Sequence, residues 1–244
     1  MNNLIKNCQK LLEAYETGQL GQTVMPEDSN PKHFGSKEER LCYFTLPMAL
    51  NYQRNSYKLW EAALKTHKNS KTRLVFDIAQ ASKMNDEDLR VILLKYKLAL
   101  QPNKHIKTWQ TISKTILENW GSLKQLIVDA DNDFLRLQQI VQKKHKKGFP
   151  YLSGPKIFNY WSFILTEYGK IKLKNAEYIE IAPDTHVIKC SIKLGLISGI
   201  EAEKITREEL SGRWRRALSG SGINPIVMHP PLWFWSRNGF KYKL

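Results

Sequence analysis

The sequence predicts an all-α protein, a compact fold of many helices, and three observations support this class. Apolar residues recur at the three-and-four spacing of a helix face along almost the whole chain. Residues that favour helix starts, such as Asn85 and Asp184, stand directly before periodic stretches. Only the segment from Glu177 to Ile181 has the pattern of an extended strand, and the chain contains no internal repeat.

The elements are expected in a simple order along the chain. A first helix carries Ile5 to Tyr15, and a polar stretch containing Gly and Pro, from about Gly18 to Ser36, predicts a long loop. An apolar stretch from Leu41 to Leu50 is interrupted by Pro47. Further helices are predicted over residues 52–64, 74–84, 106–120, 134–141 and 155–168, after Asn85, and after Asp184.

Length and composition describe an ordinary folded protein. The chain has 244 residues, 42% hydrophobic and 25% charged, which excludes a disordered or collagen-like chain. No uncharged apolar run approaches the roughly 18 residues of a membrane span, and the N-terminus lacks a signal-peptide core. Three widely spaced cysteines predict neither a disulfide framework nor a zinc finger nor a four-cysteine iron–sulfur cluster. We expect a soluble, intracellular, cytoplasmic protein without a membrane partner, and one unit over residues 1–244.

The chain is basic, and its charge is unevenly distributed. It contains 38 Lys and Arg against 23 Asp and Glu, a net charge of +15. Residues 1–100 carry 15 basic and 11 acidic groups, whereas residues 101–244 carry 23 and 12. A concentrated basic surface is typical of a protein that binds a polyanion such as nucleic acid, and a basic surface kept for solubility is the alternative.

The segment from Phe149 to Leu165 contains the first candidate for chemistry, Lys156. Pro150, Gly154 and Pro155 predict a turn, and proline suits the first position of the helix that follows. Lys156 lies at the edge of the apolar stripe of that helix. Burial among apolar side chains lowers the pKa of a lysine, and a neutral amine is the nucleophile of Schiff-base chemistry. A lysine in the first turn of a helix is more commonly a solvated surface group.

The segment from Ile181 to Gly195 contains the second candidate, Asp184. The order Pro183, Asp184, Thr, His186 before a periodic apolar stretch predicts a helix start with Asp184 as its N-cap. A carboxylate at this position can also stabilise a developing positive charge or accept a proton. Capping alone is the more common role for an aspartate in this pattern.

Together, the two segments resemble the helix-hairpin-helix DNA glycosylases. The hairpin of that family has the form Leu-Pro-Gly-x-Gly-x-Lys, and a Pro-x-Asp-x-His-Val segment follows it. Gly154 and Lys156 match the second glycine and the catalytic lysine of the hairpin. Asp184, 28 positions after the lysine, matches the catalytic aspartate, and His186 follows in register. The family's first hairpin glycine corresponds to Leu152 here, and the chain is most similar to the archaeal 8-oxoguanine DNA glycosylases.

The resemblance implies two helical lobes with the active site in a cleft between them and a helix-hairpin-helix element over about 140–168. It implies a glycosylase and AP lyase of base-excision repair that flips a damaged base, expected to be 8-oxoguanine, out of double-stranded DNA. Lys156 is then expected to form a Schiff base with the sugar while Asp184 assists, and β-elimination cuts the strand. No metal or other cofactor is implied, and a nucleoid-associated monomer is expected. The alternatives are a glycosylase for a different base lesion and a non-catalytic helix-hairpin-helix DNA-binding protein.

Further residues are candidates for DNA contact or for the base pocket. In the family that the chain resembles, a polar run after an early helix fills the gap left by the flipped base; an ordinary helix start is the alternative here. Lysines before the hairpin can bind phosphates, and the aromatic C-terminal segment can supply walls for an extruded base, although dense aromatic residues more often form core. The DNA-binding candidates are Gln53, Arg54, Asn55, Lys146, Lys147, Gly154 and His186, and the base-pocket candidates are His229, Trp233 and Trp235.

Overall fold

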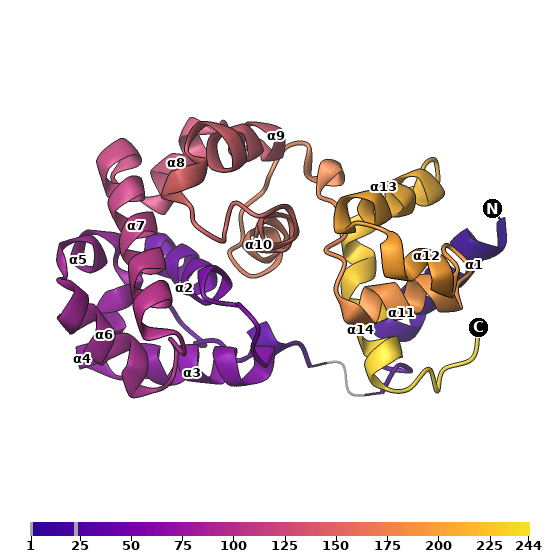
Figure 1. Cartoon of the computed structure of the whole chain (residues 1–244), viewed down its shortest axis with the longest axis horizontal. Helices are drawn as coiled ribbons and strands as arrows, with labels where there is room; N and C mark the ends of the chain where they lie inside the picture. The colour runs from indigo at the N-terminus through magenta and orange to yellow at the C-terminus, as the bar shows by residue number, and fades with distance from the viewer. Residues whose placement is uncertain (1, 22–23) are drawn as a thin grey trace. The chain divides into compact units, whose positions relative to one another are not determined.

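The computed structural model describes residues 2–21 and 24–244, and its regular structure is helical (Figure 1). Fourteen α-helices and six short 3-10 or π segments lie within these ranges, and no strand does. A single β-bridge, between Asp133 and Lys174, is the isolated exception in the same ranges. The all-α class is therefore confirmed. Residues 22 and 23 of the predicted loop lie outside the described residues. Over the described ranges, no helix is both long enough and apolar enough to cross a bilayer.

The chain divides into two compact units, which we call the central unit and the terminal unit. The central unit is Met25–Ala176, and the terminal unit combines Met1–Val24 with Glu177–Leu244. The elements of the central unit are η1 (Pro26–Asp28), α2 (Lys37–Ala49), α3 (Ser56–Lys68), α4 (Ser70–Arg73), η2 (Leu74–Phe76), α5 (Ile78–Lys83), α6 (Asp86–Lys95), α7 (Pro102–Trp120), α8 (Leu123–Asp129), α9 (Phe134–Gln138), the π segment η3 (Gln139–Lys144), η4 (Lys146–Gly148) and α10 (Pro155–Glu167).

Side-chain caps fix where the helices of the central unit begin. The side chain of Asn85 accepts a hydrogen bond from the backbone nitrogen of Asp88 at 2.8 Å, which confirms the predicted cap of α6. Ser36 caps α2 in the same way, and Asp133 caps α9. Each cap satisfies a backbone N–H that the first turn of a helix leaves without an intrahelical partner. The interrupting effect expected of Pro47 is small, because Pro47 lies in the last turn of α2.

Three buried tryptophans organise the core of the central unit. Trp60, Trp109 and Trp161 are each at most 1% exposed. The indole nitrogen of Trp109 donates to the carbonyl of Val75 at 3.0 Å, and that of Trp161 donates to the hydroxyl of Thr45 at 3.0 Å. These bonds satisfy the polar atom of each buried ring. Helix α7 packs against α5 and α6, and α10 packs against α2, so the helix that carries Lys156 is anchored in this core.

The terminal unit joins the first helix of the chain to the last ones. Its elements are α1 (Asn2–Glu16), α11 (Thr185–Lys193), α12 (Gly199–Lys204), α13 (Arg207–Leu218), η6 (Pro225–Met228) and α14 (His229–Arg237). Helix α14 packs against α11 and α1, where the rings of Tyr15 and Phe234 stack with centroids 5.9 Å apart. Trp214 is fully buried and its indole nitrogen donates to the hydroxyl of Ser191 at 2.9 Å. Trp214 therefore belongs to the core of this unit.

The sequence predicts an extended segment from Glu177 to Ile181, and this prediction is wrong for Glu177 and Tyr178. A 3-10 turn, η5 (Ala176–Tyr178), occupies this place. The guanidinium of Arg215 donates to the carbonyls of Glu177 and Tyr178 at 3.3 and 2.8 Å. Because a side chain satisfies these carbonyls, the segment needs no neighbouring strand, and Ile179 and Ile181 are buried without a sheet.

Candidate functional site

Lys156 is exposed at the beginning of α10, so it is a solvated surface group and is not buried among apolar side chains. Gly154 is the N-cap residue of this helix, Pro155 is its first residue and Lys156 its second, as the turn signals predict. On the other side of the helix, Ile157 and Trp161 are buried in the core of the central unit. Lys156 thus projects from a helix whose opposite face is fixed by packing, which is how a reactive side chain is held in place on a scaffold.

The turn before α10 takes its left-handed residue at Tyr151. The φ angle of Tyr151 is 65°, whereas Gly154 has an ordinary φ of −64°, and Leu152 is fully buried. A left-handed φ disfavours residues other than glycine, so other contacts must hold this turn. The hydroxyl of Tyr151 donates to the backbone carbonyl of Asn51, and its ring lies edge-on to Tyr52 with centroids 5.4 Å apart. These contacts tie the turn to a segment 100 positions earlier in the chain.

The structure therefore places the candidate run Gln53–Asn55 beside the turn that precedes Lys156. Gln53 follows Tyr52 directly, is exposed, and also has a left-handed φ of 46°. The ammonium of Lys104 lies 4.0 Å from the ring centroid of Tyr52, within the range of a cation–π contact. Strained backbone, aromatic rings and a cation thus lie close together in the central unit, and strained backbone is more common at functional sites than elsewhere.

Arg54 and Asn55 have structural partners in this structure. The guanidinium of Arg54 donates to the carbonyls of Leu98 at 2.6 Å and Lys97 at 2.9 Å, and burial lowers its pKa to about 10. Asn55 caps α3 by accepting from the backbone nitrogen of Lys58 at 3.1 Å. Of the three candidates in this run, Gln53 and Asn55 are exposed, whereas Arg54 is partly buried.

The basic segment before the turn that contains Tyr151 is exposed. Lys146 and Lys147 lie in η4 and both side chains are exposed, as are those of Lys143 and Lys144. Between them the ring of His145 packs edge-on against a tryptophan of α7, with ring centroids 4.9 Å apart. The central unit carries 26 Lys and Arg against 14 Asp and Glu, so +12 of the net charge of +15 belongs to this unit.

Asp184 lies in the terminal unit and caps α11, as its position in the sequence predicts. Its Oδ1 accepts hydrogen bonds from the backbone nitrogens of His186 and Val187, both at 2.9 Å. The side chain is half-buried, and Oδ2 receives no hydrogen bond from the other described residues. The cap fixes the carboxylate in one orientation and leaves its second oxygen available to accept a proton or to face a positive charge.

A cluster of polar and aromatic side chains from α11 and α14 surrounds this cap. Nδ1 of His186 lies 3.1 Å from the hydroxyl of Ser236, and the rings of His186 and Trp233 have centroids 5.4 Å apart. The guanidinium carbon of Arg237 lies 4.8 Å from the ring centroid of Trp233. Burial lowers the pKa of His186 below its ordinary value, so the imidazole is mainly neutral at pH 7.

The other two base-pocket candidates are more deeply buried than Trp233. Trp235 is 3% exposed, and its indole nitrogen donates to the carbonyl of Tyr242 at 2.9 Å. Its ring packs edge-on against Phe240 with centroids 4.8 Å apart. His229 is 6% exposed at the first position of α14. Trp233 is half-buried, and it is the member of the set that lies beside His186.

The candidate residues are divided between the two units. Sequence reasoning missed Tyr52, Lys104 and Tyr151, because their contacts join segments far apart in the chain and no local pattern marks them. The central unit holds Gln53, Arg54, Asn55, Lys146, Lys147, Gly154 and Lys156, and the terminal unit holds Asp184, His186, His229, Trp233 and Trp235.

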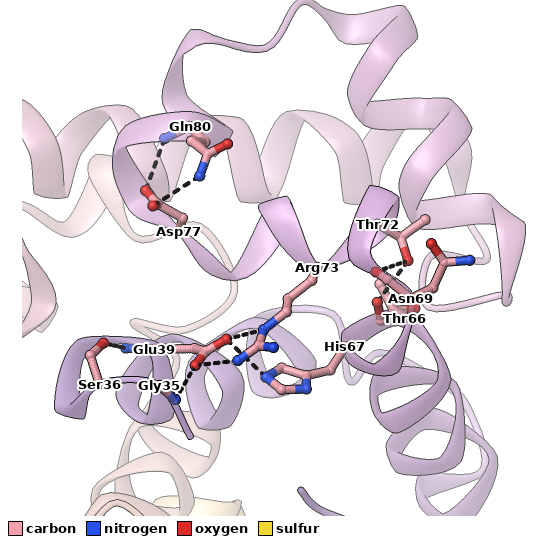
Figure 2. A network of polar contacts seen from close by, with 10 residues as sticks. All are labelled: Gly35, Ser36, Glu39, Thr66, His67, Asn69, Thr72, Arg73, Asp77 and Gln80. Carbon is pink, nitrogen blue, oxygen red and sulfur yellow. Dashed lines mark hydrogen bonds and ion pairs between the residues drawn. The ribbon is translucent and has the colours of Figure 1, made fainter. Parts of the chain in front are cut away.

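A surface pocket of about 420 Å³ lies elsewhere in the central unit, and Figure 2 shows the polar network at its wall. Glu39 accepts hydrogen bonds from the backbone of Gly35 at 2.7 Å and from Arg73 at 2.8 Å, and it contacts His67 at 3.0 Å. The hydrogen bond from Arg73 is the main reason that the pKa of Glu39 falls to about 2. Asp77, drawn in the same view, caps α5. Figure 2 also shows separate contacts of Asp77 with Gln80 and of Thr72 with the carbonyls of Thr66 and Asn69. Contacts of this kind, in which each polar group has a protein partner, are typical of a region that supports the fold.

Comparison with known proteins finds no protein-family model that matches the chain and no curated protein that is significantly similar to it. Among the described residues, no group of three or more His, Cys, Asp or Glu side chains is arranged to hold a metal ion. The three cysteines are unpaired and buried, and burial raises the pKa of the Cys8 thiol to about 12. Buried thiols of this kind are poor nucleophiles, so the exposed amine of Lys156 is the stronger candidate for covalent chemistry.

Proposed function

We propose that the protein is a DNA glycosylase with AP lyase activity that removes a damaged base, expected to be 8-oxoguanine, from double-stranded DNA. The observation that carries this function is the exposed Lys156 at the start of α10, directly after the turn that contacts residues 51–52. The helical segments over 134–148 and 155–167, joined by this turn, fit the helix-hairpin-helix element that the resemblance implies.

The surface around the turn suits a nucleic acid. Lys146 and Lys147 supply exposed positive charge directly before the turn, where they can contact phosphates. Tyr52 and Tyr151 offer aromatic faces, and the ammonium of Lys104 adds charge next to them. Aromatic rings together with cations are the groups on which proteins hold unstacked bases and their backbone. The excess of positive charge in the central unit favours the same partner.

The proposed reaction begins when the neutral amine of Lys156 attacks C1′ of the flipped nucleotide. The C1′–Nζ bond forms, the glycosidic C–N bond breaks, and the base leaves with the electron pair of that bond. The amine then loses its proton, the C1′–O4′ bond opens as O4′ takes up a proton, and a protonated Schiff base results. Loss of a proton from C2′ expels the 3′ phosphate by β-elimination. Hydrolysis by water finally restores the lysine.

Asp184 is proposed to accept the proton of the attacking amine and to stabilise positive charge on the sugar. The capped Oδ1 and the second oxygen, Oδ2, fit this role, because a carboxylate needs one fixed orientation to act on a passing nucleotide. Asp184→Asn tests this role, because asparagine caps helices as well as aspartate does but carries no charge. The variant is therefore expected to slow adduct formation while α11 keeps its cap.

A non-catalytic DNA-binding protein is the second candidate, and the exposed basic segment over residues 143–147 favours it, since this charge suffices for binding without chemistry. Borohydride trapping separates the two functions. Wild type, Lys156→Ala and the control Lys172→Ala, an exposed lysine of the same unit, are each incubated with duplexes containing 8-oxoguanine or a preformed abasic site. Borohydride reduces the C=N bond of a Schiff base and makes the adduct permanent.

The lyase predicts an adduct with wild type and Lys172→Ala on both duplexes and none with Lys156→Ala. An adduct on the abasic duplex alone keeps the covalent mechanism and assigns the glycosylase step to a different base lesion. No adduct on either duplex refutes the lyase. Binding that falls steeply with salt and ignores the lesion then identifies the protein as a DNA-binding module.

A further inference from the structure

A buried carboxyl group lies against the helix that carries Lys156. Glu27, in η1, is 1% exposed, and its Oε1 accepts a hydrogen bond from the hydroxyl of Tyr160. Tyr160 stands four positions after Lys156 on α10, so the two side chains share one side of the helix. Glu27 and Tyr160 are 133 positions apart in the sequence, and both belong to the central unit.

Two contacts, with Phe163 and with Glu27, hold the side chain of Tyr160. Its ring stacks on Phe163, with centroids 5.9 Å apart and an interplanar angle of 30°, and its hydroxyl is fixed by Glu27. Side chains of a helix lean toward its N-terminus, and each covers the surface of the turn before its own Cα. The ring of Tyr160 therefore covers the first turn of α10, from which Lys156 projects. A change in how the hydroxyl is held changes the surroundings of that turn.

Ionisation of a glutamate at this buried position is energetically unfavourable. Burial raises the pKa of Glu27 to about 7, against the opposing effect of the Tyr160 hydrogen bond, and Asp28 raises it slightly further. Of the elements packed against η1, α10 contributes the hydroxyls of Tyr160 and Tyr168, α2 contributes the hydroxyl of Tyr43, and α3 contributes no charge that lowers this pKa. A glutamine offers the same acceptor without the cost of burying a charge, so stability alone does not explain the carboxyl group.

We infer that Glu27 is a positioning residue for the lysine nucleophile, acting through the Tyr160 hydroxyl on the first turn of α10, an assignment that rests on the proposed lyase activity. The ionised carboxylate accepts a stronger hydrogen bond than the neutral acid does. Tyr160 is therefore held more firmly as Glu27 loses its proton near neutral pH. The rate of Schiff-base formation then includes a contribution from the ionisation of a group that never touches the DNA.

The test measures the rate of borohydride-trapped adduct formation on a duplex with a preformed abasic site, at saturating protein, between pH 6 and pH 8. Three variants are compared with wild type. Tyr160→Phe removes the hydroxyl, and Glu27→Gln keeps an acceptor that cannot ionise. Tyr168→Phe is the matched control, because its hydroxyl donates to Asp28 at 2.9 Å at the other end of the same helix. Duplex affinity and circular dichroism are recorded for each protein.

Tyr160→Phe is expected to slow adduct formation by about 10- to 100-fold with unchanged duplex affinity, the usual effect of a misplaced reacting group. Glu27→Gln is expected to match wild type at pH 6 and to fall about fivefold behind it at pH 8, because a neutral acceptor is held less strongly. Tyr168→Phe is expected to behave as wild type. A glutamate with a purely structural role predicts a Glu27→Gln protein that is no slower at any pH.

Adducts that form at the wild-type rate in Tyr160→Phe and Glu27→Gln at every pH overturn the positioning role and leave the lyase standing. Absence of any adduct with wild type overturns the lyase and the positioning role with it. If Tyr160→Phe does not fold, the comparison of wild type with Glu27→Gln across pH decides alone, since glutamine preserves the size of the side chain.

Discussion

Replacing Glu27 with glutamine is expected to stabilise the central unit at alkaline pH and to change its stability little at pH 5. Glu27 is 1% exposed and its carboxyl group is the acceptor for the Tyr160 hydroxyl. Glutamine has the same shape and retains an acceptor oxygen. The substitution therefore removes an ionisation while it preserves packing, and the pH dependence of its effect reports on that ionisation alone.

The sign and size of the effect follow from proton linkage. Burial raises the pKa of Glu27 from 4.5 to about 7, so the folded state holds the proton more tightly than the unfolded state does. The free energy of unfolding then falls as the pH rises above about 4.5, and the loss is complete somewhat above pH 7. At 1.36 kcal/mol for each pKa unit, the full loss is about 3 kcal/mol. A glutamine does not titrate, so the free energy of unfolding of the variant does not fall in this way.

Thermal unfolding of wild type and Glu27→Gln at pH 5 and pH 8.5 measures the effect. The difference in Tm between the two proteins is expected to increase by roughly 6–12 °C from the lower to the higher pH, at 2–4 °C per kcal/mol for a chain of this size. Any constant cost of burying the amide cancels in this comparison. A difference in Tm that is the same at both pH values refutes the raised pKa and the burial from which it follows.

Two further predictions concern stability. Arg54→Ala leaves the carbonyls of Lys97 and Leu98 without their donor and is expected to lower the free energy of unfolding in urea by about 1–3 kcal/mol; a loss below about 0.5 kcal/mol contradicts the structural role of Arg54. The contact with Arg73 helps to hold the pKa of Glu39 at about 2, and Glu39→Gln weakens this contact. The stabilisation that the variant loses is present above pH 4.5 in wild type and disappears as the pH falls toward 2. Wild type is therefore expected to be more stable than the variant at pH 7, and this difference in stability is expected to shrink in an acid titration followed by circular dichroism. A difference that stays constant contradicts the lowered pKa of Glu39.

Local patterns predicted the features whose causes are local. Asn85 and Asp184 were expected to cap helices, and both do, because a cap needs only a short polar side chain before a periodic stretch. The apolar stripe around Trp109 marks a buried helix face for the same reason. The segment after Glu177 shows the limit of such patterns: alternating residues fit a strand, but Arg215 satisfies the backbone at its start instead.

Features that depend on distant partners were not visible in the sequence. Glu27 lies in a stretch whose polarity predicts an exposed loop, and its burial follows from Tyr160, 133 positions away. Tyr151 adopts a left-handed backbone that its sequence neighbours do not require, because its hydroxyl reaches the carbonyl of Asn51. Arg54 likewise finds its carbonyl partners more than 40 positions away. Candidate residues are thus predictable by type, but their partners depend on packing.

Mass spectrometry of the borohydride-trapped adduct tests the central claim most directly. The wild-type protein is trapped on a duplex containing 8-oxoguanine and digested, and the peptide that carries the reduced sugar is sequenced. The lyase mechanism predicts that the modification lies on Lys156, the exposed lysine in the first turn of α10. A modification on a lysine of the basic segment over residues 143–147, or no modified peptide at all, contradicts the assignment of Lys156 as the nucleophile.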